Sequence, residues 1–121
     1  DDPVATYGMF AKKLSSKGIA FIEVVEDSFQ GNAADGRPEE VIRAIRENFK
    51  CAYIANGNYS AEEARKRIMA GQADLVSFGR LYISNPDLPK RFQLGAELND
   101  YDEETFYGGD EQGYTDYPSL D

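Results

Sequence analysis

Three short apolar runs stand out along the chain, at Ile19–Val25, Ala52–Ala55 and Ala73–Phe78. Their apolar residues are nearly continuous rather than alternating with polar ones, which is typical of parallel strands covered on both faces. We therefore expect three buried β-strands in this order.

The segments around these runs carry helical patterns with recognisable ends. Pro3 directly after Asp2 favours the start of a helix, and Gly18 lies where that helix is expected to end. Residues 60–63 read Ser-Ala-Glu-Glu, which is a capping box, and Gly71 lies at the matching C-terminal end. These signals predict two helices.

Two further helices are indicated. One begins at Pro38 and places four apolar residues on one face: Val41, Ile42, Ile45 and Phe49. A short one is expected to begin at Asn85–Pro86. The predicted order is α-β-α-β-α-β-α followed by an irregular tail, and this alternation implies right-handed βαβ units around a parallel sheet.

Composition narrows the class of protein. The chain has 121 residues, of which 41% are hydrophobic and 29% charged, as expected for one globular domain. It has no apolar run long enough to cross a membrane and no charged-then-apolar leader, so we expect a cytoplasmic protein without membrane contact. Because it begins at Asp1, at a helix cap and without an initiator Met, we expect a processed piece of a longer protein.

Cysteine and histidine usage excludes several kinds of site. With one Cys and no His, the chain cannot form an intrachain disulfide, a Cys-rich zinc site or a His-dependent catalytic triad. The single thiol, Cys51, begins an apolar strand, and we expect it to be buried and structural rather than nucleophilic.

Charge is concentrated at the C-terminal end. The net charge is −9, and residues 97–121 contain nine acidic residues and no basic one. This argues against nucleic-acid binding, which requires clustered Lys and Arg. The same segment contains five aromatic residues, so we expect an ordered tail packed against a larger body.

The loops after the second and third strands carry the candidate chemistry, because strand-end loops form the sites of such folds. Gly57 and Asn58 lead into a helix start, which offers backbone N–H groups to an anion. Gly79 permits close backbone approach, and Arg80 supplies a planar, permanently charged fork for phosphate. Together they predict a shared phosphate site; the alternatives are turn glycines and a surface ion pair.

Two other charged groups have simpler interpretations. Glu23, Glu26 and Asp27 are compatible with a carboxylate cluster for a metal ion or for acid–base chemistry, but a solvated strand end is the favoured interpretation. Residues 65–67 (Arg-Lys-Arg) lie between acids on a helix, which predicts a solvated outer face.

Longer motifs resemble the old yellow enzyme family of FMN-dependent ene-reductases. The most specific are ADLVSFGR at 73–80, ISNPDLP at 83–89 and GYTDYP at 113–118. Shorter matches occur in the expected order at 18–21, 98–99 and 105–107. The resemblance runs over essentially the whole chain and implies an α/β fold, namely the C-terminal part of a (β/α)8 TIM barrel, about strands 6–8 with their helices and tail.

The resemblance also implies a division of the chain and a cofactor. Residues 1–96 would form three βα units of the barrel, and residues 97–121 a tail packed over the barrel mouth. FMN would be the cofactor, NAD(P)H the hydride donor, and an activated alkene or a nitro compound the small-molecule substrate. The family's substrate-binding His-Asn or His-His pair is not in this chain, which has no His, so a complementary N-terminal barrel chain or segment would be needed. We expect this chain alone to be inactive.

The resemblance assigns site residues only where its motifs match. The FMN phosphate would be held by the two strand-end loops, through Gly57, Asn58, Gly79 and Arg80. Tyr107 would line the substrate pocket. Phe29 would be a second pocket residue, with a loop anchor packed on the next helix as the alternative. No catalytic residue and no metal ligand is expected in this chain.

The sequence also fits a second class of function. The chain is also compatible with a non-catalytic α/β fragment or assembly module that binds phosphate-bearing ligands weakly at most. A yellow sample that contains flavin and a second polypeptide would favour the enzyme hypothesis. A colourless sample that contains a single polypeptide species would favour the assembly module.

Overall fold

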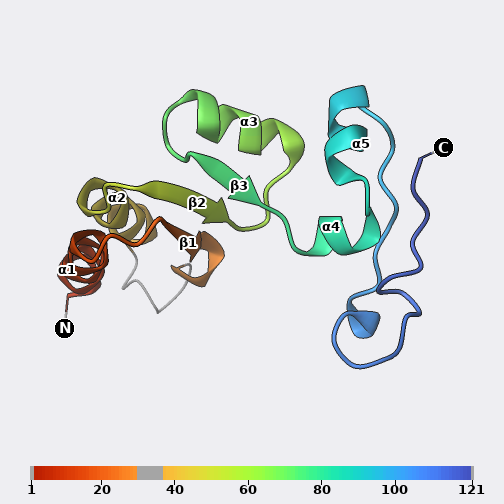
Figure 1. Ribbon diagram of the computed structural model, residues 1–121, viewed down its shortest axis with the longest axis horizontal. Helices are drawn as coiled ribbons and strands as arrows, with labels where there is room; N and C mark the ends of the chain where they lie inside the picture. Colours follow the sequence, from red (N-terminus) through yellow and green to blue (C-terminus); the bar gives the residue numbers. More distant parts are fainter. Residues whose placement is uncertain (1, 30–36, 121) are drawn as a thin grey trace. The chain divides into compact units, whose positions relative to one another are not determined.

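The computed structural model describes residues 2–29 and 37–120, with only the backbone described at Ser28 and Phe29 (Figure 1). The chain divides into two compact units, residues 1–77 and residues 78–121.

The first unit is a parallel α/β arrangement, as predicted. Its three strands lie in the order β1-β2-β3, and both neighbouring pairs are parallel (Figure 1). The elements are α1 (Pro3–Ser16), β1 (Phe21–Val25), the 3-10 helix η1 (Glu26–Phe29), α2 (Pro38–Asn48), β2 (Ala52–Asn56), α3 (Ala61–Met69) and β3 (Leu75–Ser77). Val25, Asn56 and Ser77 are in register at the carboxyl edge of the sheet.

Local capping explains where the helices begin and end. The side chain of Asp2 accepts a hydrogen bond from the backbone N–H of Val4 (3.1 Å), which satisfies one of the free donors at the start of α1. Ser60 and Glu63 form the predicted capping box at α3. Gly18 and Gly71 follow α1 and α3 with φ values of 72° and 67°. The predicted ends of both helices are confirmed.

The core lies between two helices and one face of the sheet. Figure 1 shows α1 and α2 side by side, and they pack against each other and against the strands. Burial alternates along β2, so that Tyr53 and Ala55 point into the core. The other buried members of the core are Ala11, Val24, Val41, Ile42, Ile45, Phe49 and Ala73.

Among the described residues of this unit, none covers the opposite face of the sheet. Phe21, Val25 and Leu75 are 55%, 51% and 54% exposed. The apolar runs are typical of strands covered on both faces, and the described residues of this chain cover one of the two. Between these apolar side chains, Ser77 donates to Glu23 (Oγ to Oε1, 2.5 Å) and accepts from Asn56 (2.8 Å), which links the three strands by polar contacts.

The second unit contains α4 (Arg80–Ser84), α5 (Leu88–Leu94) and the 3-10 helix η3 (Glu103–Thr105). A single helix was expected to begin at residues 85–86, whereas the structure ends α4 just before them and begins α5 at Leu88. The described residues contain no helix that is long and apolar enough to cross a membrane.

Candidate functional site

The turn after β2 lies close against η1. A Cβ atom placed on Gly57 would lie 3.1 Å from Oδ1 of Asp27 and 3.3 Å from Cε2 of Tyr59, so a larger residue would force these neighbours apart. In the described part of the chain, the backbone N–H groups of Gly57 and Asn58 donate to no protein acceptor. The turn therefore presents two consecutive donors at the carboxyl edge of the sheet.

A largely buried cluster of charged and hydroxyl groups lies next to this turn. Nη2 of Arg67 on α3 donates to both carboxylate oxygens of Glu26, at 2.6 and 2.7 Å. The hydroxyl of Tyr53 donates to Oε1 of Glu26 at 2.7 Å, and the hydroxyl of Tyr59 donates to Oε2. This cluster joins η1, strand β2, the turn after β2 and helix α3.

The cluster contradicts two interpretations made from the sequence. The side chain of Glu26 is only 8% exposed and that of Arg67 17%, so neither belongs to a solvated strand end or a solvated helix face. Burial, followed by the hydrogen bond to Glu26, raises the pKa of Tyr59 to about 12 and raises that of Tyr53 further. Both tyrosines therefore remain neutral donors to the carboxylate at ordinary pH.

The loop after β3 belongs to the second unit. A Cβ atom on Gly79 would meet nothing within 4 Å, so the backbone there is open to approach. Arg80 is the first residue of α4, and its Nη1 lies 2.9 Å from Oε1 of Glu103. This hydrogen bond is the main cause that raises the pKa of Arg80 above its usual value.

The tail is ordered around a small aromatic group. Phe106 is 5% exposed, and its ring lies 5.6 Å from that of Tyr101 and 6.0 Å from that of Tyr107. Tyr107 itself is 88% exposed. A side chain on Gly113 would collide with Thr105, whose Oγ1 donates to the carbonyl of Gly113 at 2.8 Å, so this turn requires glycine.

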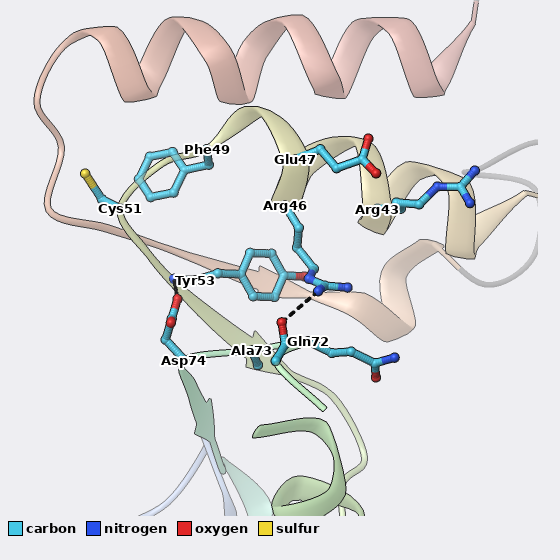
Figure 2. A pocket seen from close by; sticks show the side chains of 10 residues that line it. Arg43, Arg46, Glu47, Phe49, Cys51, Tyr53, Gln72, Ala73 and Asp74 are labelled. Atoms are coloured by element: carbon cyan, nitrogen blue, oxygen red, sulfur yellow. Dashed lines mark hydrogen bonds between the residues drawn. The ribbon is translucent and has the colours of Figure 1, made fainter. Parts of the chain in front are cut away.

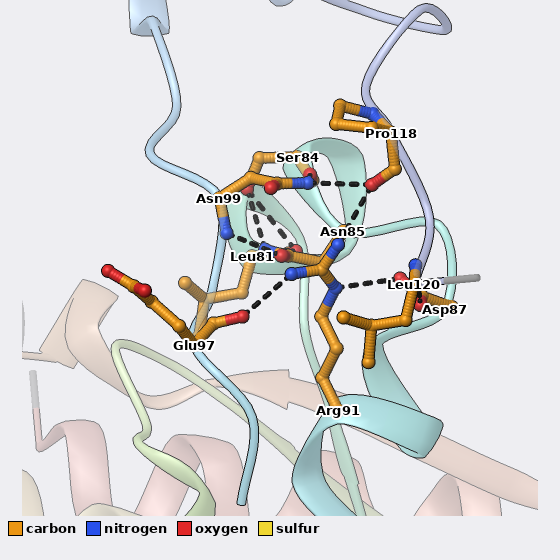
Figure 3. Close-up of polar contacts among 9 residues, drawn as sticks. All are labelled: Leu81, Ser84, Asn85, Asp87, Arg91, Glu97, Asn99, Pro118 and Leu120. Carbon is orange, nitrogen blue, oxygen red and sulfur yellow. Dashed lines mark hydrogen bonds and ion pairs between the residues drawn. The ribbon is translucent and has the colours of Figure 1, made fainter.

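Arg91 attaches both ends of the tail to α5 (Figure 3). It is 4% exposed and donates to the carbonyls of Glu97 (2.6 Å) and Pro118 (2.9 Å) and to the carboxylate of Asp87 (2.8 Å). Asn99 adds hydrogen bonds from its Nδ2 to the carbonyl of Pro118 and from its backbone to Asn85, both of 2.8 Å. This network is not predictable from the sequence, because nothing local distinguishes Arg91 from a surface arginine.

A separate cavity of the first unit lies near the start of β2 (Figure 2). It has a volume of about 340 Å³, and the guanidinium of Arg46, which Figure 2 labels, donates to the carbonyl of Gly71 at 3.0 Å. Cys51 lines this cavity and is exposed, so the prediction of a buried thiol is wrong. None of the candidate site residues lies there.

The candidate site residues divide between the two units. Gly57 and Asn58 lie in residues 1–77, and Gly79, Arg80 and Tyr107 lie in residues 78–121. The side chain of Phe29 lies outside the part of the chain that the structure describes. Each loop separately offers what a phosphate group requires, namely open backbone donors in the first and a guanidinium beside an open glycine in the second.

The first unit is a parallel α/β arrangement, and the loops after its second and third strands carry backbone N–H groups and a guanidinium. Residues 5–99 match the profile of the NADH:flavin oxidoreductase / NADH oxidase family. The chain belongs to this family, which comprises FMN-dependent oxidoreductases and includes the old yellow enzymes. The resemblance inferred from the sequence motifs is confirmed.

Named relatives agree with this assignment. The chain is 44% identical to putative 12-oxophytodienoate reductase 12 of Oryza sativa subsp. japonica and 37% identical to 12-oxophytodienoate reductase 2 of Arabidopsis thaliana. Both alignments cover 99% of this chain and 32% of the relative. The chain thus spans about a third of the length of the relatives it matches.

Solved structures give the same result. A structure of morphinone reductase in complex with tetrahydroNAD has a TM-score of 0.84 and 45% identity, over 100% of this chain and 31% of that one. A variant of NCR from Zymomonas mobilis has a TM-score of 0.84 and 38% identity, over 97% of this chain and 38% of that one. The similar structures are TIM-barrel enzymes, so the parallel βα units of this chain are those of such a barrel.

Proposed function

We propose that this chain is the C-terminal barrel segment, about strands 6–8, of an FMN-dependent NAD(P)H oxidoreductase of the ene-reductase type. In this proposal it supplies the phosphate site of the flavin and part of the substrate pocket. The observation that carries the proposal is the chemistry of the two strand-end loops. The backbone N–H groups of Gly57 and Asn58 have no acceptor among the described residues, and a guanidinium lies beside the open backbone of Gly79.

These residues fit a phosphate group. A phosphate monoester near neutral pH is close to a dianion, and its desolvation requires charge-assisted hydrogen bonds. The amides of Gly57 and Asn58 would donate to its oxygens, Gly79 would allow close approach, and Arg80 would supply a full positive charge. The buried Glu26–Arg67 pair would hold the turn that contains the first two donors in place.

The remaining chemistry belongs to the cofactor and to the rest of the barrel. FMN, when bound, would supply the hydride-transfer chemistry between NAD(P)H and an activated alkene or a nitro compound. The exposed ring of Tyr107 would line the pocket in which that substrate lies, and Phe29 would be a second wall. No residue of this chain is assigned a proton transfer.

A complementary N-terminal barrel segment is part of the proposal. The uncovered sheet face carries Phe21, Val25 and Leu75, each more than half exposed, and a closed barrel would cover these side chains with the facing strands. The complete protein should therefore be yellow and contain the remaining strands, whether in one polypeptide or two. A colourless sample of this chain that binds no partner would favour the assembly module.

The decisive experiment compares FMN dissociation constants of the complete protein with and without Arg80. One hydrogen bond to a charged group contributes about 1.5–3 kcal/mol, so Arg80→Ala should weaken FMN binding about 10- to 150-fold. The FMN dissociation constant of Arg80→Lys should lie between those of the parent and of Arg80→Ala, because lysine keeps the positive charge and lacks the two-pronged guanidinium. Arg65→Ala, at an exposed position on α3, is the control. An FMN affinity within twofold of the parent for Arg80→Ala would refute the phosphate site.

A further inference from the structure

We propose that Glu103 in the C-terminal tail lowers the affinity of Arg80 for the phosphate group by competing for its guanidinium. This inference rests on the proposed phosphate site and names a residue that adjusts its strength. It assigns a binding role to the tail beyond that of lining a pocket.

The pairing of the two residues is direct. Nη1 of Arg80 donates to Oε1 of Glu103 at 2.9 Å, and the side chains are 48% and 62% exposed. An ion pair of this exposure is readily exchanged, because water and dissolved ions compete for both groups. A ligand that reaches Arg80 can therefore displace Glu103 without breaking any part of the core.

The local structure of the tail presents Glu103 at this position. Glu103 begins η3, whose first turn is capped by the side chain of Asp102 (Oδ1 to the N–H of Glu104, 3.0 Å). The N–H of Asp102 donates to the hydroxyl of Tyr117 at 3.2 Å. Phe106, directly after η3, is 5% exposed. These contacts fix the backbone that carries Glu103, so its side chain remains beside Arg80.

The charges of the two possible partners make them competitors. A guanidinium has five N–H donors, so it has room for both anions, but its single positive charge is partly neutralised by whichever anion is already bound. A carboxylate beside a phosphate also repels it, since like charges a few ångströms apart disfavour each other. Glu103 should therefore weaken phosphate binding at Arg80.

The tail contains a matched control for this charge. Glu104 is the neighbouring residue, is also exposed, and its side chain forms no hydrogen bond or ion pair within the described residues. Glu104→Gln removes the same charge from the same turn without touching Arg80. A difference between Glu103→Gln and Glu104→Gln therefore reports the contact with Arg80 rather than the general acidity of the tail.

The test measures dissociation constants of the complete protein for FMN and for riboflavin, which lacks the phosphate. Glu103→Gln should bind FMN about three- to fivefold more tightly than the parent, the size expected for an exposed ion pair. Its affinity for riboflavin should be unchanged, and Glu104→Gln should alter neither affinity. A purely structural role for Glu103 would change both ligands together.

A double-mutant cycle completes the test. In an Arg80→Ala background, the gain in FMN affinity from Glu103→Gln should disappear, because the guanidinium for which Glu103 competes is then absent. The inference is overturned if Glu103→Gln changes FMN affinity by less than 1.5-fold (about 0.2 kcal/mol), weakens it, or acts equally on riboflavin. If Arg80→Ala itself leaves FMN binding intact, the proposed phosphate site fails; if it weakens FMN while Glu103→Gln has no effect, only the competition by Glu103 fails.

Discussion

Arg67 on α3 and Glu26, the first residue of η1, form a nearly buried ion pair, in which Nη2 lies 2.6 Å and 2.7 Å from the two carboxylate oxygens. The residues are 41 positions apart in sequence. Two tyrosine hydroxyls complete the coordination of the carboxylate, from Tyr53 and Tyr59. The pair therefore ties the turn with the proposed phosphate donors to the first strand and the third helix.

Breaking this ion pair should lower the stability of the folded protein. Glu26→Gln keeps the shape of the side chain and leaves Arg67 without its counter-charge, so the free energy of unfolding should fall by about 2–4 kcal/mol. Urea unfolding of the complete protein measures this change. The control is Glu62→Gln, whose partner Lys66 lies 2.7 Å away with both side chains more than 70% exposed, and it should have no measurable effect. Equal effects of the two substitutions would contradict the structural role of Glu26.

The raised pKa of Tyr59 predicts a loss of stability in alkali. In the unfolded chain a tyrosine loses its proton near pH 10, whereas folded Tyr59 keeps it until about pH 12, because of burial and the hydrogen bond to Glu26. Its stabilising contribution is thus fully present below pH 10 and is lost as the pH rises to about 12.

A comparison with Tyr59→Phe measures this contribution. The stability difference between parent and variant should be constant from pH 8 to pH 10 and should then shrink by about 1–2 kcal/mol towards pH 12. Denaturant unfolding over this range provides both curves. Parallel curves for the two proteins would mean that Tyr59 titrates alike in the folded and unfolded chains.

Arg91 should control the order of the tail. In the Arg91→Lys variant, the ammonium lacks the planar guanidinium and cannot donate to Asp87, Glu97 and Pro118 together. Carbonyls that Arg91 pairs in the parent would therefore lose their donor. Hydrogen exchange of residues 97–120 should accelerate at least about tenfold, the change in opening equilibrium that corresponds to about 1.4 kcal/mol. Gln93→Ala, at an exposed position of the same helix, should leave the exchange rates unchanged. Unchanged rates for Arg91→Lys would show that other contacts hold the tail.

The uncovered face of the sheet should be needed for assembly. Leu75 is 54% exposed on β3, and burying a leucine side chain stabilises a contact by about 1.5–3 kcal/mol. Leu75→Asp should therefore weaken association with the complementary segment, or destabilise the complete protein, by at least that amount. The control is Met69→Asp at the end of α3, which is 81% exposed and should have little effect. Sedimentation and thermal unfolding distinguish the two variants.

Much of the fold follows from local signals in the sequence. The proline after Asp2, the capping box from Ser60 and the apolar runs each act within a few residues, because capping and burial periodicity are properties of neighbouring positions. These signals predicted α1, α3 and the three strands. The motif of Gly79 and Arg80 after the third strand led to the family, which the profile match over residues 5–99 confirms.

Other features depended on contacts between distant residues. From the sequence, Glu26 was interpreted as a solvated strand end, because no residue near it in sequence supplies a counter-charge. In the fold, Arg67 supplies that charge. Cys51 begins an apolar strand, yet the position of that strand at the edge of a cavity exposes it. Helix α4 was missed because its five residues are too few to show a helical period.

The sequence by itself determined the βαβ order, the helix ends and the family, because these depend on residue type and local spacing. The tertiary structure alone decided which charges are buried and which are paired. Glu103 shows the distinction: in sequence it is one of nine acids in the tail, and only the folding of the tail places it 2.9 Å from Arg80. Ion pairs between distant residues form where the backbone brings opposite charges together, and that geometry is a property of the whole fold.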